Sequence, residues 1–140
     1  MTITRTFLTL IGIVYLYLAG WCSLMPERTS RLVGFDLIPG SGQSEFLVIY
    51  GGLELAMALI FLLPLLRPRQ MESSLLSCFI IHACLVFFRS VSFFLYSDIQ
   101  PMTLKLAFYE WLIFLAAAVL VWRESQQHRT TEATIQNSKP

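Results

Sequence analysis

Residues 46–66 read FLVIYGGLELAMALIFLLPLL, and this stretch decides the fold class. Glu54 is its only charged residue. About 20 consecutive apolar residues are enough to cross the hydrocarbon core of a bilayer as a helix. Because no water is present there, the backbone amides must be satisfied within the segment, and a helix does this. The stretch therefore predicts a transmembrane helix that carries one carboxyl group near its middle.

Three further stretches share this length and character, at residues 7–25, 75–96 and 102–122. The 140-residue chain is 56% hydrophobic and only 14% charged, whereas a soluble domain has roughly 25% charged residues. The first stretch is longer than the core of a cleaved signal peptide, so we expect it to be retained. The sequence thus predicts an all-α integral membrane four-helix bundle that occupies residues 1–123.

The connections between the spans predict how they are joined. In PERTSRLVGF, Pro26 is a favourable first residue for a short helix and Gly34 a favourable end, so we expect a short interfacial helix after the first span. The links RPRQMESS and YSDIQP are short, so the helices they join should be antiparallel neighbours. Residues 124–140 are polar and lack periodicity, which predicts a disordered tail.

Lysine and arginine counts predict the orientation, because cytoplasmic loops carry the excess of both residues. The side that holds both termini has Arg5, Arg67, Arg69, Arg123, Arg129 and Lys139. The opposite side has Arg28, Arg31 and Lys105. Both termini, and with them the polar tail, are therefore predicted to be cytoplasmic.

Four charged or histidine side chains fall well inside the spans, away from their ends, and they are the candidate site. They are Glu54, His82, Arg89 and Glu110. An acid or arginine at the centre of a membrane helix costs roughly 2.5–3.5 kcal/mol by insertion scales, so these groups should face inward and meet. At a rise of about 1.5 Å per residue, the two acids and the arginine lie at comparable depth. We expect a Glu–Arg–Glu cluster in which one acid holds a proton, since two carboxylates face one guanidinium.

Helical periodicity adds supporting residues to this cluster. Cys78, His82, Arg89, Ser92 and Tyr96 form one polar stripe on the third span. On the second span, Gly51 and Gly52 should allow close packing of another backbone. The residues expected to support the site are Tyr50, Gly51, Gly52, Ser92 and Tyr109.

Each of these residues also has a purely structural interpretation. An arginine–glutamate pair can fix the register of two helices without binding any ligand. His82 can be a core histidine bonded to a neighbouring backbone or hydroxyl group instead of a proton carrier. Tyr50 and Tyr109 can be packing residues.

Motifs for other chemistry are not found. The sequence has no HExxH, GxSxG, P-loop or Rossmann fingerprint, and its three cysteines lack metal-ligand spacing. We therefore expect no catalytic residues, metal or cofactor. A net charge of +1 offers no basic surface for nucleic acid.

A family resemblance rests on GWCSLMPE, YGGLELAMAL, an arginine in the third span and YEW in the fourth. These motifs resemble an uncharacterised family of small four-helix bacterial membrane proteins, broadly similar to DoxX-like proteins. The resemblance covers about residues 7–122 and implies a bacterial inner (plasma) membrane location and a weak link to redox or accessory roles. The positions that carry it are Trp21, Pro26, Tyr50, Gly51, Gly52, Arg89 and Glu110.

Three functions are consistent with these features. The favoured one is a non-enzymatic bundle in the lipid bilayer that binds a partner membrane protein or a small amphipathic ligand. The alternative is a proton-coupled carrier of a small solute, which would need a homo-oligomer because four helices make a narrow bundle. The least favoured is a membrane redox subunit or an enzyme acting on a lipid or quinone.

Overall fold

The computed structural model describes residues 2–137, with side chains described up to residue 127, and every regular element in this range is a helix. Four helical segments are long and apolar enough to cross a membrane: Thr2–Leu24, Ser41–Leu66, Pro68–Leu95 and Pro101–Gln127. The predicted all-α four-helix membrane bundle is thus confirmed, and the chain is a multi-pass membrane protein. Most large apolar side chains are exposed, as expected for a surface that faces hydrocarbon.

The second span is one continuous helix with a π-helical middle. It consists of α3 (Ser41–Phe46), the π-helix η1 (Leu47–Leu53) and α4 (Glu54–Leu66). The residues at both junctions have right-handed helical dihedrals, so the axis is not broken. A π-helix is rare and occurs often at functional sites. Here it ends directly before Glu54.

The other long helices extend beyond the predicted spans. They are α1 (Thr2–Leu24), α5 (Met71–Leu95), which follows the 3₁₀ turn η2 (Pro68–Gln70), and α6 (Pro101–Asn137). Up to Asn137, α6 continues through most of the segment for which the composition predicts disorder, and residues 138–140 lie outside the described part. Thr4 donates a hydrogen bond of 2.8 Å to Glu124, so the start of this segment packs on α1.

The predicted short helix after the first span is α2 (Pro26–Leu32), and the expected glycine, Gly34, lies in the turn that terminates it. Gly34 has a φ of +86°, its N–H donates to the carbonyl of Arg31, and the N–H of Phe35 donates to the carbonyl of Ser30. These two bonds make a Schellman motif, which favours glycine at the residue with positive φ.

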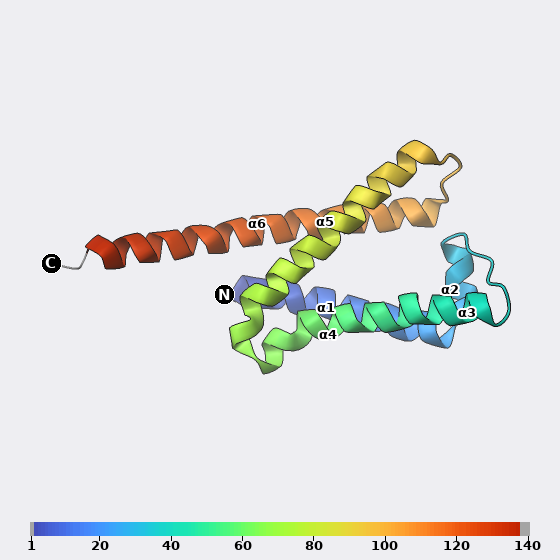
Figure 1. The fold of residues 1–140 in the computed structure, drawn as a ribbon, viewed down its shortest axis with the longest axis horizontal. Helices are drawn as coiled ribbons and strands as arrows, with labels where there is room; N and C mark the ends of the chain where they lie inside the picture. The colour runs from blue at the N-terminus through green and yellow to red at the C-terminus, as the bar shows by residue number, and fades with distance from the viewer. Residues whose placement is uncertain (1, 138–140) are drawn as a thin grey trace.

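The four long helices form two pairs (Figure 1). α1 packs mainly against α4 and η1, whereas α5 packs mainly against α6. α5 starts beside the end of α4 and crosses obliquely, so that it finishes beside the start of α6. Consequently α4 and α5 diverge with increasing distance from the short link that joins them.

The core draws on all four long helices and uses small residues where helices approach closely. Leu8, Ala58 and Cys78 are fully buried, and Ala117 of α6 joins the same cluster. A Cβ added at Gly12 of α1 would lie 2.6 Å from the Cγ of Leu62, so only glycine permits this approach. Small residues of this kind are the usual packing surface between membrane helices.

Pro64 lies inside α4 and is buried. Proline has no N–H, so the carbonyl of Ile60 loses the donor that an α-helix would supply from residue 64. The Ser74 hydroxyl of α5 donates to that same carbonyl at 2.8 Å. A hydrogen bond between helices therefore replaces the one that the proline removes, as the low-dielectric interior requires.

Candidate functional site

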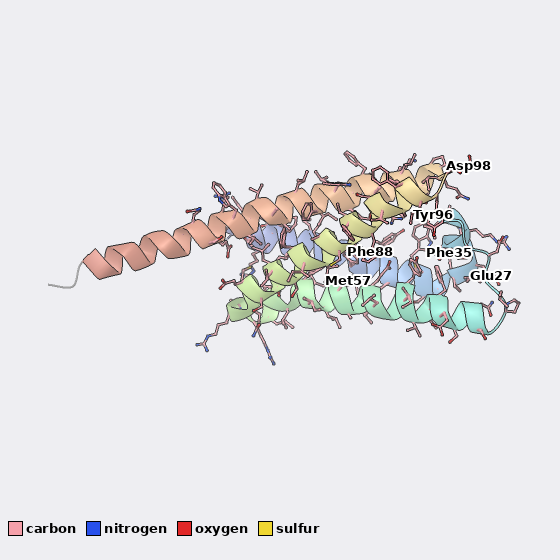
Figure 2. All side chains as sticks on the ribbon, turned by 45° about the horizontal axis from the view of Figure 1, so that its top comes forward. Glu27, Phe35, Met57, Phe88, Tyr96 and Asp98 are labelled. Atoms are coloured by element: carbon pink, nitrogen blue, oxygen red, sulfur yellow. The ribbon has the colours of Figure 1, made fainter. Side chains whose placement is uncertain are left out.

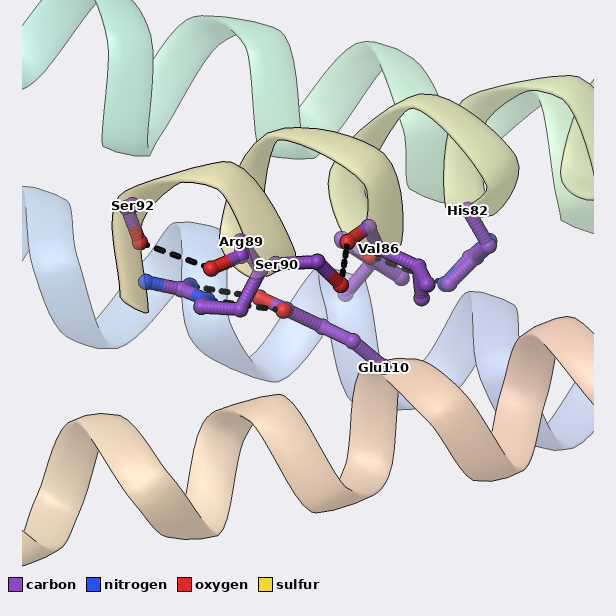
Figure 3. A network of polar contacts seen from close by, with 7 residues as sticks. His82, Val86, Arg89, Ser90, Ser92 and Glu110 are labelled. Atoms are coloured by element: carbon purple, nitrogen blue, oxygen red, sulfur yellow. Dashed lines mark hydrogen bonds and ion pairs between the residues drawn. The ribbon is translucent and has the colours of Figure 1, made fainter. Parts of the chain in front are cut away.

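Arg89 and Glu110 form a two-point ion pair between α5 and α6 (Figure 3). The Nε of Arg89 donates to Oε2 of Glu110 at 2.9 Å, and Nη2 donates to Oε1 at 2.7 Å. The side chains are 26% and 15% exposed. Parallel charge-assisted bonds of this kind are strong and geometrically specific. Both carboxylate oxygens of Glu110 are engaged, and the pair is electrically neutral.

Glu54 does not join this pair, so the expected Glu–Arg–Glu cluster is a pair and a separate acid. Arg89 is on α5 beside α6, at the end of α5 that has diverged from α4. The oblique crossing of α5 explains why the expected cluster does not form. Positions along the helices predict which side chains lie at the same depth in the membrane, but they do not predict which helices are in contact. Glu54 makes no hydrogen bond or ion pair with the described side chains, and its Oε2 is shielded from solvent without a partner.

Tyr50 connects the two parts of the site. The phenol is partly buried and lies within electrostatic range of Glu54, Arg89 and Glu110. Its ring stacks on Phe46 with centroids 4.4 Å apart and meets Phe35 edge-on at 6.1 Å. Tyr50 therefore packs against two aromatic rings and is also near the charged groups.

His82 is fully buried and has two polar partners. Its Nδ1 lies 2.8 Å from the carbonyl oxygen of Cys78, and its Nε2 lies 3.2 Å from the hydroxyl of Tyr15. A carbonyl can only accept, so Nδ1 carries a proton and donates it. In the neutral ring Nε2 is then the acceptor, and the Tyr15 hydroxyl donates to it. This arrangement matches the core histidine described above.

Tyr15 is a polar residue of the interior that the sequence analysis missed. It is buried on α1, on the face that also holds Leu8, Gly12 and Ala19. That helical spacing was the available signal, because a tyrosine among small and apolar inward residues needs a partner for its hydroxyl. Figure 3 shows His82 farther along α5 from the Arg89–Glu110 pair, so the polar groups follow one side of this helix.

Of the supporting residues predicted from the sequence, some have the expected packing or hydrogen-bond contacts and others do not. Ser92 donates to the carbonyl of Arg89 in its own helix at 2.8 Å. A Cβ at Gly51 would lie 2.5 Å from Ser23 Oγ, so Gly51 allows the expected close approach. Gly52 does not, because nothing lies within 4 Å of a Cβ there.

The open space at Gly52 is an apolar groove of about 450 Å³ between α1 and η1. The groove explains why the second glycine has no packing partner. Tyr109 is also away from the site: its ring is 58% exposed and contacts Phe108. Tyr96, expected at the end of the polar stripe, follows the last residue of α5 and is 66% exposed.

Groups of three or more histidine, cysteine, aspartate or glutamate side chains that could hold a metal ion are not found among the described residues. Comparison with protein-family models, curated proteins and solved structures finds no match to this chain. The resemblance to DoxX-like membrane proteins therefore stays a prediction.

Proposed function

We propose that the protein is a binding or accessory bundle of the bacterial inner membrane, with both termini in the cytoplasm. In this proposal the Arg89–Glu110 pair holds α5 against α6, and Glu54 recognises a ligand or partner. A relationship of this chain to DoxX-like membrane proteins is part of the same proposal and rests on the motifs around Tyr50, Arg89 and Glu110.

The observation that carries the proposal is the isolation of Glu54. Its Oε2 is the one shielded side-chain oxygen or nitrogen without a hydrogen-bond partner in the part of the chain with described side chains. A buried acceptor without a donor costs about 1–3 kcal/mol, and more if it is charged. A molecule or partner that donates to Glu54 would remove this cost, which supports a binding role.

The position of Glu54 supports the same role. It follows directly on η1, which is the kind of helical irregularity that occurs often at functional sites. Phe35 and Tyr96 lie at the end of the bundle that holds the α5–α6 link (Figure 2). Phe35 meets Tyr50, which precedes Glu54 by four residues in the same helix. A ligand could reach the acid from that end.

The test is to identify what stays bound to the protein. Wild-type protein and the Glu54→Gln variant are purified in mild detergent and examined by native mass spectrometry. We expect a bound small molecule, lipid or partner in the wild type and its loss in the variant. Glu45→Gln is the control, because Glu45 is an exposed acid of α3. Equal adducts in wild type and Glu54→Gln would contradict the proposal.

Proton-coupled transport is the second candidate, and the bond between His82 and Tyr15 favours it. These two proton-bearing groups are buried together and joined by a hydrogen bond. A hydrogen-bonded pair of this kind could pass a proton between its two members. In proteoliposomes, this function requires a proton flux that is lost in Glu54→Gln and Glu110→Gln, whereas a binding bundle gives no flux in any variant.

A further inference from the structure

Going one step beyond the proposed function, on which this step rests, we infer a binding site for an amphipathic organic cation, that is, a protonated amine carried by an apolar body. The site consists of Glu54 and the aromatic residues Phe35, Phe46 and Tyr50. The inference uses three properties of the site: its charge, its aromatic lining and the small number of its oxygen ligands.

The charge of the site favours a cation. Arg89 and Glu110 neutralise one another through two hydrogen bonds. Glu54 is left as a carboxyl group without a counter-ion among the described side chains. In a low-dielectric surrounding, opposite charges attract far more strongly than in water. An ammonium group would favour the ionised form of Glu54 and would supply both its counter-charge and its missing hydrogen-bond donor.

The aromatic residues extend the site toward the end of the bundle. Tyr50 is one helical turn before Glu54, stacks on the buried Phe46 and meets Phe35. Phe35 closes the Schellman turn of α2 and is 46% exposed, so its ring is accessible at that end. Cations are attracted to the faces of aromatic rings, and aromatic residues with an acid are a common recognition set for amines.

The ligand set favours an organic cation over a metal ion. Calcium takes six to eight oxygen ligands, and magnesium requires six in a near-ideal octahedron. Glu54 is a single carboxyl, and the other acid of the interior, Glu110, uses both oxygens on Arg89. An ammonium group needs only a few acceptors and gains from the adjacent rings.

The experiment measures binding of phenethylammonium by calorimetry to the full-length protein in detergent at pH 7, where the amine is charged. The neutral analogue 2-phenylethanol has a similar shape and also donates a hydrogen bond. We expect the amine to bind wild type and Glu45→Gln equally. Glu54→Gln should bind it about tenfold more weakly or worse, and the alcohol should bind wild type at least about tenfold more weakly than the amine.

A second variant keeps the test independent of any folding defect in Glu54→Gln. Phe35→Leu retains the acid but removes the accessible ring, and we expect it to weaken amine binding several-fold while leaving the melting temperature unchanged. Undiminished amine binding to Glu54→Gln, or equal binding of amine and alcohol to wild type, would overturn the inference.

The result also separates this inference from the proposed function. If the amine fails to bind but a co-purified molecule is still lost in Glu54→Gln, the site recognises something other than a cation, and only the inference falls. If the co-purified molecule is also independent of Glu54, both the inference and the proposed function fall.

Discussion

The side chain of Arg89 shows how much depends on the geometry of a single ion pair. Its guanidinium meets Glu110 through two parallel bonds, which lysine cannot reproduce with a point charge. We expect Arg89→Lys to lower the free energy of unfolding by about 1 kcal/mol, and Arg89→Gln by about 2–4 kcal/mol, because the latter leaves Glu110 charged and unpaired. Thermal unfolding in detergent measures both variants.

The matching double variant tests the same pair. Arg89→Gln with Glu110→Gln removes both charges, so its stability should exceed that of Arg89→Gln alone. If the double variant is as unstable as the sum of the two single changes, the residues do not interact as described.

The hydrogen bond between Tyr15 and His82 gives a second prediction at this scale. Tyr15→Phe keeps the ring but leaves Nε2 of the buried His82 without a donor. We expect a loss of about 1–3 kcal/mol in the free energy of unfolding. Tyr17→Phe is the matched control, because Tyr17 is 64% exposed on the same helix and should tolerate the change. Equal melting temperatures for the two variants would contradict the bond.

Among the elements, α1 provides a matched pair of glycines. A Cβ at Gly12 would collide with Leu62, whereas nothing lies within 4 Å of a Cβ at Gly20. Gly12→Ala should therefore destabilise the protein by about 1–3 kcal/mol through overpacking. Gly20→Ala should be neutral or stabilise it by up to about 1 kcal/mol, since alanine favours the helix. Thermal unfolding of the two variants side by side checks whether α1 and α4 pack as closely as described.

At the junction of α4 and α5, the effect of replacing Ser74 should depend on whether Pro64 is present. Ser74→Ala removes the donor that serves the carbonyl of Ile60, and we expect a loss of about 1–3 kcal/mol. In a Pro64→Ala background, the alanine N–H can serve that carbonyl, so Ser74→Ala should cost clearly less. Ser77→Ala is a control, because its hydroxyl is exposed and bonds within α5. Equal costs of Ser74→Ala in both backgrounds would show that Ser74 does not replace the proline's missing bond.

The elements also show what could be predicted from the sequence. Hydropathy over residues 46–66 was sufficient to predict a span, because length and apolarity alone decide whether a segment crosses a bilayer. Pro26 and Gly34 predicted the short helix because each has a specific local geometry. The π-helix before Glu54 was not predictable in this way, because the same residues fit a regular α-helix equally well.

At the scale of the whole molecule, the sequence does not predict which helices pack against each other. Depth along each span placed Glu54, Arg89 and Glu110 at one level, and this is why a three-residue cluster was expected. The oblique path of α5 takes Arg89 to α6, whereas Glu54 is on α4, which packs mainly against α1. Crossing angles depend on the fit of many side chains, including Phe79 of α5 stacked on Phe114 of α6, and no short motif encodes them.

The orientation in the membrane is testable at the scale of the molecule. In a background with Cys22, Cys78 and Cys84 replaced by alanine, single cysteines are introduced at Thr2, Gln70 and Asp98 and treated with a membrane-impermeant maleimide in intact cells. We expect Asp98→Cys to be labelled, and the other two to react only after the membrane is opened. Labelling of Thr2→Cys in intact cells would reverse the proposed orientation.

The bond from Ser74 to the carbonyl of Ile60 has a consequence for biogenesis. The second span cannot satisfy all of its own carbonyl groups, because Pro64 lacks a donor and the replacement comes from the third span. A nascent chain that released the second span alone into lipid would expose a bare carbonyl to hydrocarbon. The two spans are joined by the short turn around Pro68–Gln70, so they can leave the insertion machinery together as a hairpin, with the serine already in place when the proline enters the bilayer.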